Sequence, residues 1–110
     1  MVIRQGSIIL MDFNPSIGHE QKGKRPALVI TNEDYYRFTN GLLIVLPITS
    51  TSSQGYPLHV RLDSRTKTQG EIMVEQPKTI DSKARQVVQL ESLPKELLKE
   101  VLSIYALMTK

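Results

Sequence analysis

Leu42-Leu43-Ile44-Val45-Leu46-Pro47-Ile48 is the most hydrophobic stretch of the chain, and we expect it to form the central strand of the fold. The almost wholly apolar run at residues 26–31 is typical of a strand that is buried on both faces. Asn40-Gly41, immediately before Leu42, is a strong turn signal. Pro47 lacks a backbone N–H, so it predicts a bulge or an exit from the sheet edge near the end of the strand.

Shorter apolar or alternating runs on both sides of this stretch predict five more strands, at residues 7–13, 26–31, 57–62, 71–75 and 86–90. We expect residues 76–81 to interrupt the strand ladder and residues 82–85 to form a single turn. Asn32 can cap a helix of one or two turns over residues 33–38.

One long helix is predicted at the C-terminal end of the chain. Ser92-Leu93-Pro94 would begin it, with a proline near its first position and a hydroxyl close by for a cap. Apolar residues then recur at helical spacing and indicate a stripe that packs on the sheet: Leu97, Leu98, Val101, Leu102, Tyr105 and Met108. The predicted fold class is α+β, mainly β, with a small, strongly bent sheet or barrel and a C-terminal helix.

The composition fits a single globular domain over residues 1–110, with one modest core. The chain has no Cys, which excludes disulfides and thiolate zinc sites, and we expect a cytoplasmic protein. No signal-peptide pattern is visible, and the longest apolar run is far shorter than the roughly 20 residues of a membrane span. A net charge of +3 suits a polyanionic partner without requiring one.

A polar loop, Ile17-Gly18-His19-Glu20-Gln21-Lys22-Gly23-Lys24-Arg25-Pro26, joins the first two predicted strands. Arg25 offers a planar, permanently charged fork for two phosphate oxygens. Lys22 and Lys24 would add a field that attracts a polyanion. The loop therefore suits phosphate binding, although a solvated connector can have the same composition.

His19 and Glu20, in the same loop, titrate in pH ranges where a general acid or base is useful. Other interpretations stay open for both residues. Glu20 could form a surface ion pair with Arg25, and His19 could simply be solvated.

Two other polar segments are candidates for the same site. Thr49-Ser50-Thr51-Ser52-Ser53 carries hydroxyls that bind phosphate and sugar oxygens, although such loops are also common connectors. Glu75-Gln76-Pro77-Lys78 ends a predicted strand with a carboxylate and an amide. His59, on an alternating strand, is expected to face water. Neither a metal-ligand spacing nor a Walker-type phosphate loop is visible in the sequence.

The charged loop resembles a known signature. Gly18-His19-Glu20-Gln21-Lys22-Gly23-Lys24-Arg25-Pro26 is similar to the G-x-E-Q-x-G-x-R-P motif of the MazF/PemK (Kid) family, the toxins of type II toxin–antitoxin modules. Pro47-Ile48-Thr49-Ser50 resembles the P-x-T-S/T segment of that family. Further matching segments, in family order and spacing, are Asn14-Pro15, Gly55-Tyr56-Pro57, Gly70, Glu75-Gln76-Pro77-Lys78-Thr79-Ile80-Asp81 and Lys83-Ala84-Arg85.

The resemblance implies a small SH3-like β-barrel of the CcdB/MazF type that works as a homodimer. It implies sequence-specific, ribosome-independent cleavage of single-stranded mRNA without a metal or another cofactor, which inhibits translation and growth. The substrate's own 2′-OH would attack the phosphate and leave 2′,3′-cyclic phosphate and 5′-OH ends. The implied protein partner is an antitoxin of the MazE/PemI kind, and no membrane is involved.

The same resemblance assigns roles to individual residues. Arg25 and Thr49 match the pair that stabilises the reacting phosphate, and the base would be His19 or Glu20. Glu75 stands where the PemK/Kid branch has a catalytic aspartate. We expect RNA contacts from Lys22, Lys24, Ser50, Thr51, Gln76 and Lys78.

One departure from the PemK/Kid pattern affects these roles. Met73 stands where that branch has a working arginine, so Arg25 must supply the cationic role, as in the MazF branch. A second hypothesis is a non-catalytic toxin of the CcdB kind, which would bind a protein such as DNA gyrase. A structural interaction domain with no polyanionic partner fits the composition alone.

Overall fold

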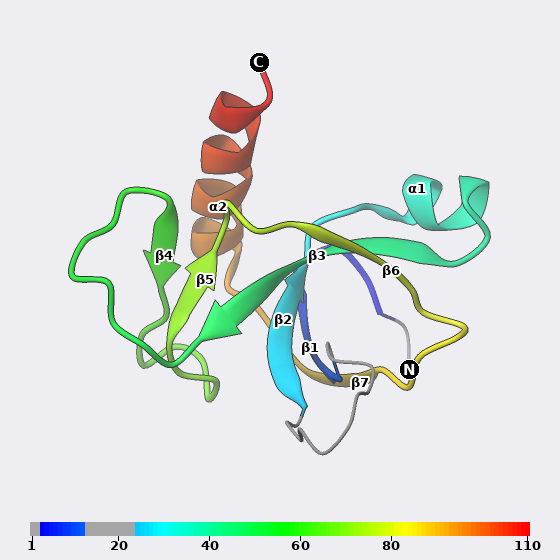
Figure 1. Cartoon of the computed structure of the whole chain (residues 1–110), viewed down its shortest axis with the longest axis horizontal. Helices are drawn as coiled ribbons and strands as arrows, with labels where there is room; N and C mark the ends of the chain where they lie inside the picture. The colour runs from blue at the N-terminus through cyan, green and yellow to red at the C-terminus, as the bar shows by residue number, and fades with distance from the viewer. Residues whose placement is uncertain (1–2, 13–23) are drawn as a thin grey trace, which may run out of the picture.

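The computed structural model of the chain describes residues 3–12 and 24–110. Its strands are β1 (Ser7–Met11), β2 (Arg25–Val29), β3 (Leu42–Thr49), β4 (His59–Arg61), β5 (Glu71–Met73), β6 (Lys78–Asp81) and β7 (Val88–Ser92). Its helices are α1 (Glu33–Phe38) and α2 (Lys95–Met108). The fold is mainly antiparallel β with a C-terminal helix, as predicted (Figure 1).

The central strand β3 is shared by three neighbours. One edge pairs with β2, and the other pairs first with β6 and then with β5. Pro47 lies between the two regions, because Val45 is paired with Lys78 of β6 and Ile48 with Ile72 of β5. A residue without an N–H is tolerated where the ladder on one edge is interrupted. Pro47 therefore marks a change of partner within the strand.

The full strand path is β4-β5-β3-β2-β1-β7, with β6 beside β3. In the described part of the chain this path does not close into a ring by backbone pairing between β4 and β7. Residues Ala27 to Val29 of β2 are fully buried, as predicted for this strand, and most of β1 and β3 is buried as well. One face packs on α2 through Leu97 and Val101, and the other forms a second cluster that includes Val45 and Ile80.

Three expectations about local structure were wrong. Residues 76–81, predicted to interrupt the strand ladder, contain strand β6. Ile80 is the one buried residue of this strand, so the sequence shows no alternation of apolar and polar residues there. The last strand is displaced to Val88–Ser92, where it pairs with β1. The N-cap of α2 is Pro94, with no side-chain cap, because Ser92 still belongs to β7.

Other local predictions were confirmed. Helix α1 covers residues 33–38, and the Asn32 side chain accepts a hydrogen bond from the Tyr35 N–H at its N-terminus. The turn at residues 82–85 is present, with the Ala84 N–H donating to the Asp81 carbonyl. Neither described helix is long and apolar enough to cross a membrane.

Gly70, the residue before β5, allows two backbones to approach closely. Its φ of +123° is in the region that favours glycine, and a Cβ there would clash with the carbonyl oxygen of Thr49. The turn before it is also held, because the Glu91 carboxylate accepts hydrogen bonds from the N–H groups of Lys67 and Thr68 at 3.1 and 2.7 Å. The chain therefore enters β5 in one fixed position beside the end of β3.

We expect Gly70→Ala to destabilise the protein by more than Gly55→Ala. Gly55 also has a positive φ, of +90°, but a Cβ there would meet no atom within 4 Å. Gly55→Ala should cost only backbone strain, about 1–2 kcal/mol, whereas Gly70→Ala adds the clash with Thr49. Urea unfolding midpoints and m-values of both variants measure the difference, and equal losses would contradict the proposed close approach.

Candidate functional site

A row of polar residues crosses the ends of three neighbouring strands. Glu71 is paired with Thr49 on one side and with Arg61 on the other. The residues next to them in sequence, such as Ile48 and Ile72, lie in the core that packs on α2. Because successive side chains of a strand alternate between faces, the polar row lies on the opposite face of the sheet.

Arg25 extends this row on the next strand. The β2–β3 pairing ends at Ala27 and Pro47. Arg25 lies two residues beyond this end on β2, and Thr49 lies two residues beyond it on β3. Arg25 is exposed and begins β2, where it is paired with Met11 of β1. The two residues predicted to act together thus lie on adjacent strands and on one face of the sheet.

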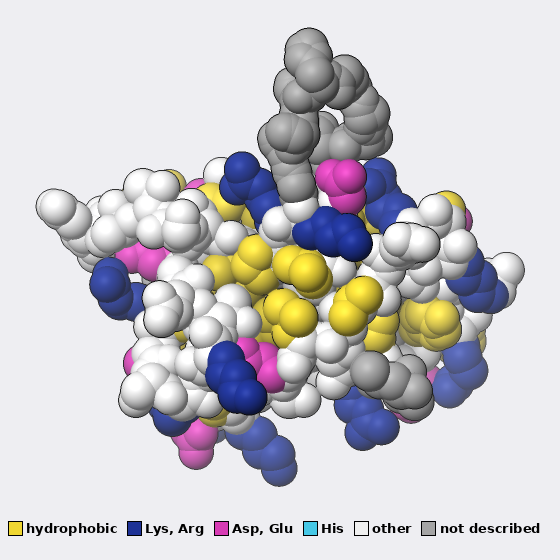
Figure 2. Space-filling view, turned by 90° about the horizontal axis from the view of Figure 1, so that it is seen from below, with side chains coloured by type: hydrophobic (Ala, Val, Ile, Leu, Met, Phe, Trp, Pro, Cys, Tyr) yellow, Lys and Arg dark blue, Asp and Glu magenta, His cyan; other side chains and the backbone are white. Residues whose placement is uncertain are grey.

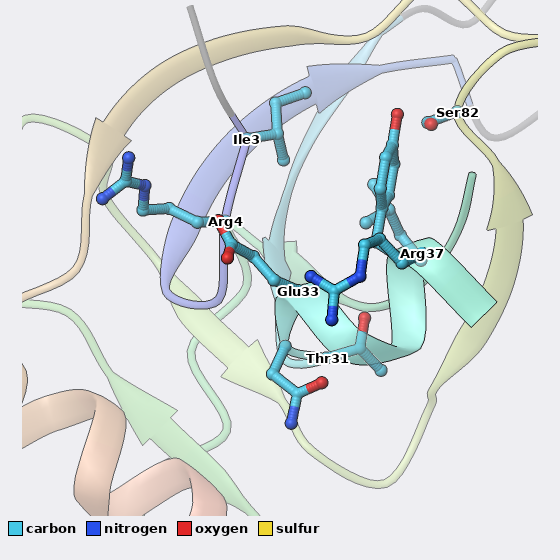
Figure 3. Close-up of a pocket in the computed structure, with 9 residues that line it drawn as sticks. Ile3, Arg4, Thr31, Glu33, Arg37 and Ser82 are labelled. Atoms are coloured by element: carbon cyan, nitrogen blue, oxygen red, sulfur yellow. The ribbon is translucent and has the colours of Figure 1, made fainter. Parts of the chain in front are cut away.

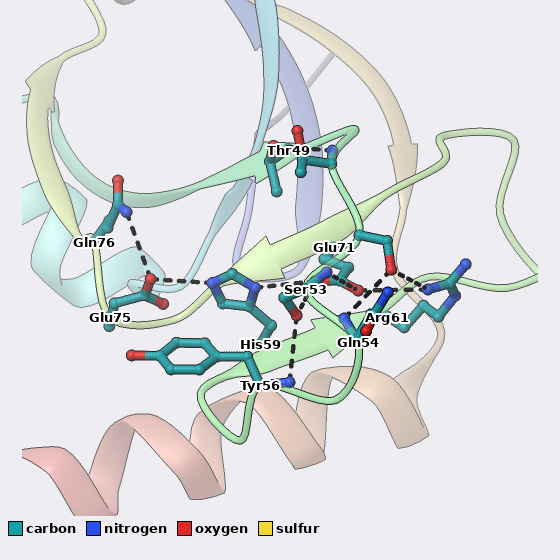
Figure 4. Close-up of polar contacts among 11 residues, drawn as sticks. Thr49, Ser53, Gln54, Tyr56, His59, Arg61, Glu71, Glu75 and Gln76 are labelled. Atoms are coloured by element: carbon teal, nitrogen blue, oxygen red, sulfur yellow. Dashed lines mark hydrogen bonds and ion pairs between the residues drawn. The ribbon is translucent and has the colours of Figure 1, made fainter.

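Glu71 is a buried carboxylate with several donors around it (Figure 4). The Ser53 hydroxyl donates to it at 2.6 Å, and the Ser53 N–H donates at 3.2 Å. The His59 ring lies 3.0 Å away through Nδ1, and Arg61 Nη1 lies 3.4 Å away. The hydrogen bonds from Ser53, followed by that from His59, lower the pKa of Glu71 to about 2.

His59 lies between two carboxylates. Its Nε2 is 3.0 Å from Glu75 Oε2, in addition to the Nδ1 contact with Glu71. The Tyr56 ring packs edge-on against it, with 4.7 Å between ring centroids. Burial lowers the pKa of His59, but the hydrogen bonds to Glu71 and Glu75 outweigh it and raise the pKa above 6.5. The expectation that His59 faces water was wrong, since its side chain is only 12% exposed.

Glu75 lies in the turn after β5 and is held mainly by His59. Its Oε1 is buried and has no hydrogen-bond partner among the described residues. The Gln76 amide is 3.5 Å from Oε2, at the limit of a hydrogen bond, and Gln76 is itself exposed. The position of the Glu75 carboxylate therefore depends on one strong contact.

The hydroxyl loop lies beside the polar row. Thr49 Oγ1 accepts a hydrogen bond from the Thr51 N–H at 3.1 Å, which fixes the oxygen while the hydroxyl keeps its own proton for donation. Ser50 and Thr51, both exposed, line a hollow of about 380 Å³ together with Arg61 and Glu71. This hollow offers hydroxyl, guanidinium and carboxylate groups to a polar ligand.

Two of the three predicted lysines, Lys24 and Lys78, lie within the described residues. Lys24 is exposed immediately before β2, and Lys78 is exposed at the start of β6, where it is paired with Val45. His19, Glu20 and Lys22 lie outside the described residues. Within residues 3–12 and 24–110, no group of three or more His, Cys, Asp and Glu side chains is arranged to hold a metal ion.

A second cavity, of about 470 Å³, lies beside α1 (Figure 3). Arg4 and Arg37 line it together with Glu33, over apolar groups that include Ile3. The cavity contains none of the residues predicted from the sequence to act on phosphate. The polar row at the ends of β3, β4 and β5 is therefore the candidate site.

Sequence reasoning missed His59, Glu71 and Arg61 as members of this site, and it included Ser53 only within the hydroxyl loop, as a contact to phosphate or sugar and not to Glu71. A signal for two of them was present, because Arg61 and Glu71 are opposite charges on consecutive alternating strands, as expected for a cross-strand pair. The link from His59 to Glu75 depends on the turn after β5 and could not be deduced from spacing.

The sequence and the fold match a class of small toxins. Residues 4–108 match the family described as the PemK-like, MazF-like toxin of type II toxin–antitoxin system. The chain belongs to this family, which confirms the resemblance drawn from the charged loop.

Individual relatives agree with this assignment. The chain is 38% identical to Endoribonuclease PemK of Escherichia coli over 105 residues, 91% of this chain and 77% of that protein. It is 30% identical to Endoribonuclease EndoA of Bacillus subtilis over 104 residues, 92% and 89% of the two chains. The crystal structure of MazE–MazF (Form-II) from Deinococcus radiodurans superposes with a TM-score of 0.87 at 32% identity, covering 99% and 96%.

The stability of the protein should fall as pH decreases from about 4.5 to about 2, partly because Glu71 becomes protonated. The folded-state pKa of Glu71 is lowered, so its contribution is present above the unfolded pKa and is lost on acidification. Glu71→Gln should be less stable at neutral pH and should lose less stability across this range. Urea unfolding at a series of pH values measures both effects.

Asp63→Asn is the matched control. The pKa of Asp63 is also lowered to about 2, by Arg65, but both side chains are about half exposed. An exposed pair contributes little, so this variant should stay close to the parent at neutral pH. If Asp63→Asn were as destabilising as Glu71→Gln, burial of Glu71 would not be the cause of its effect.

Proposed function

We propose that this protein is the toxin of a type II toxin–antitoxin system and a metal-independent endoribonuclease that cleaves single-stranded mRNA. The observation that carries the proposal is that Arg25 begins β2 and Thr49 ends the adjacent β3, where it is paired with Glu71, in a chain whose relatives are named endoribonucleases. Cleavage of mRNA would inhibit translation and growth. We further propose one domain over residues 1–110, acting in the cytoplasm without a cofactor.

The proposed reaction is an internal transfer of the phosphate. The 2′-OH attacks the adjacent phosphorus while a base takes its proton, and the bond from phosphorus to the 5′ oxygen breaks. The 5′ oxygen leaves with a proton, which gives a 2′,3′-cyclic phosphate and a 5′-OH. Negative charge gathers on the phosphate oxygens in the transition state, where preorganised donors stabilise it.

Arg25 and Thr49 would supply these donors. The Arg25 guanidinium is exposed and permanently charged, and it can stabilise the crowded phosphate or protonate the leaving oxygen. The Thr49 hydroxyl, fixed by the Thr51 N–H, can donate to a phosphate oxygen. Arg25 carries the cationic role because Met73, half-buried in β5, can neither donate a proton nor pair with phosphate.

The base that takes the 2′-OH proton is one of three groups in this proposal. His19 and Glu20 are the leading candidates from the family signature. Glu75 is the third, and its carboxylate has one oxygen without a hydrogen-bond partner among the described residues. Contacts to RNA would come from Lys22, Lys24, Ser50, Thr51, Gln76 and Lys78.

The partners we propose are a second copy of this chain, RNA, and an antitoxin of the MazE/PemI kind. Figure 2 shows hydrophobic side chains gathered between Lys and Arg side chains on the face below the sheet of Figure 1. Edge strand β7 leaves Val88 and Leu90 about half exposed. Such an apolar surface with a basic margin supports self-association next to a polyanion site.

Arg25→Ala and Thr49→Ala should each reduce cleavage of single-stranded RNA by about 100-fold or more, because each removes a donor to the charged transition state. Both residues are outside the core, so the folded state should persist. Initial rates on a defined RNA, with circular dichroism as the folding check, measure this. Arg37→Ala, which removes an exposed arginine on α1, should cleave at the parent rate. Unimpaired cleavage by both Arg25→Ala and Thr49→Ala would refute the assigned roles.

Cleavage should continue in EDTA and should stop when the nucleotide 5′ of the cut carries a 2′-deoxy sugar. The attacking group is then absent, while the phosphate contacts remain. Gel analysis of matched ribose and 2′-deoxy substrates, followed by identification of the 5′-OH ends, provides the measurement. A cut in the 2′-deoxy substrate would exclude attack by the 2′-OH.

A further inference from the structure

We propose that His59 is the positioning residue of the site: as a doubly protonated imidazolium, it holds Glu71 and Glu75 at once and so fixes the loop that follows Thr49 and the turn that carries Glu75. This inference rests on the proposed function for its effect on RNA cleavage. The protonation state itself can be tested without RNA.

With both neighbouring carboxylates ionised, the geometry around the ring calls for a proton on each nitrogen. Each ring nitrogen lies 3.0 Å from a carboxylate oxygen, Nδ1 from Glu71 and Nε2 from Glu75. Ionised carboxylates only accept hydrogen bonds, and a neutral imidazole has only one N–H. A neutral ring would therefore place one nitrogen lone pair against a carboxylate oxygen. The imidazolium satisfies both contacts.

The first contact connects His59 to the hydroxyl loop. Glu71 accepts hydrogen bonds from the N–H and the hydroxyl of Ser53. Glu71 is also the cross-strand partner of Thr49. Without a cation at Nδ1, the Glu71 carboxylate, only 5% exposed, would lose one of its charged partners. The loop that follows Thr49 would then lose part of what fixes it.

The second contact connects His59 to the segment that contains Glu75 and Gln76. Glu75 Oε1 is buried without a partner among the described residues, so its burial is unfavourable. The His59 contact at Oε2 offsets this cost. If the contact is lost, we expect the carboxylate to turn outward toward water and the Gln76 side chain to move with it.

The groups that face the ring come from every element packed against it. They are Glu71 of β5, Glu75 of the following turn and Tyr56 of the loop before β4. Arg61, on the same strand as His59, is bonded to Glu71 and compensates part of its charge. Helix α2 packs on the opposite face of β4, through Val60.

The arrangement makes the site sensitive to alkaline pH. The folded-state pKa of His59 is raised, so the contribution of the imidazolium is complete below the unfolded pKa of 6.5 and is lost as pH rises through the folded value. We expect cleavage to decline on the alkaline side as this proton is lost. A general base alone would produce a rise with pH instead.

His59→Asn and His59→Gln test the two carboxylate contacts separately, because each variant keeps a donor for one of them. Asn keeps a donor near the Nδ1 position, toward Glu71, and Gln keeps one near the Nε2 position, toward Glu75. Each variant should lower kcat/KM on single-stranded RNA by about 10- to 100-fold, the range expected when an active-site group is displaced by about 1 Å. Both should lose the alkaline decline. Tyr56→Phe keeps the ring contact and should match the parent rate and pH profile.

NMR of the ¹⁵N-labelled protein tests the protonation state directly. The His59 ring, assigned by comparison with the His59→Gln spectrum or by selective labelling, should show two protonated nitrogens at neutral pH and titrate above 6.5. A singly protonated ring would overturn the proposal, and so would parent-like rates and pH profiles in both His59 variants. If the parent protein cleaves no RNA while the ring is doubly protonated, the proposed function fails and the His59 arrangement stands.

Discussion

A strand that pairs with three neighbours cannot slide, and β3 is in this position. Its register with β2 is fixed on one edge, while β6 and β5 fix it independently on the other. A shift by one residue would reverse which side chains face each core. Pro47, which has no N–H to offer, falls where the second edge changes partner. Thr49 at the end of this strand is thus positioned by backbone pairing, before any side-chain contact is considered.

The fixed register of β3 also determines where the polar site lies. Once Ile48 and Ile72 are committed to the core under α2, their neighbours Thr49 and Glu71 must lie on the other face. A carboxylate buried there requires donors, and Ser53 and His59 supply them. The loop after β3 is therefore linked to Glu71 through Ser53, and the turn after β5 is linked to the same carboxylate through His59.

The sequence allowed much of the fold and part of the site to be predicted. Apolar runs located the central strands, and helical spacing located α2, because both signals come from burial of many residues. Strand β6 was missed because Ile80 is its one buried residue and leaves no apolar pattern in the sequence. The family signature indicated Arg25 and Thr49, whereas His59 was misjudged, since its partners Glu71 and Glu75 become neighbours only through tertiary pairing.

Gly70 has a consequence for how this chain could vary. The charged turn at residues 63–69 is anchored at its base, by the close approach of Gly70 to Thr49 and by the bonds from Lys67 and Thr68 to Glu91. Thr66 is buried and the Thr68 hydroxyl donates to Glu91, but exposed side chains of the turn, such as Ser64 and Gln69, can be exchanged without displacing the strands that carry Thr49 and Glu71. Substitutions at these exposed positions would change which ligands enter the adjacent hollow, while Thr49 and Glu71 keep their positions.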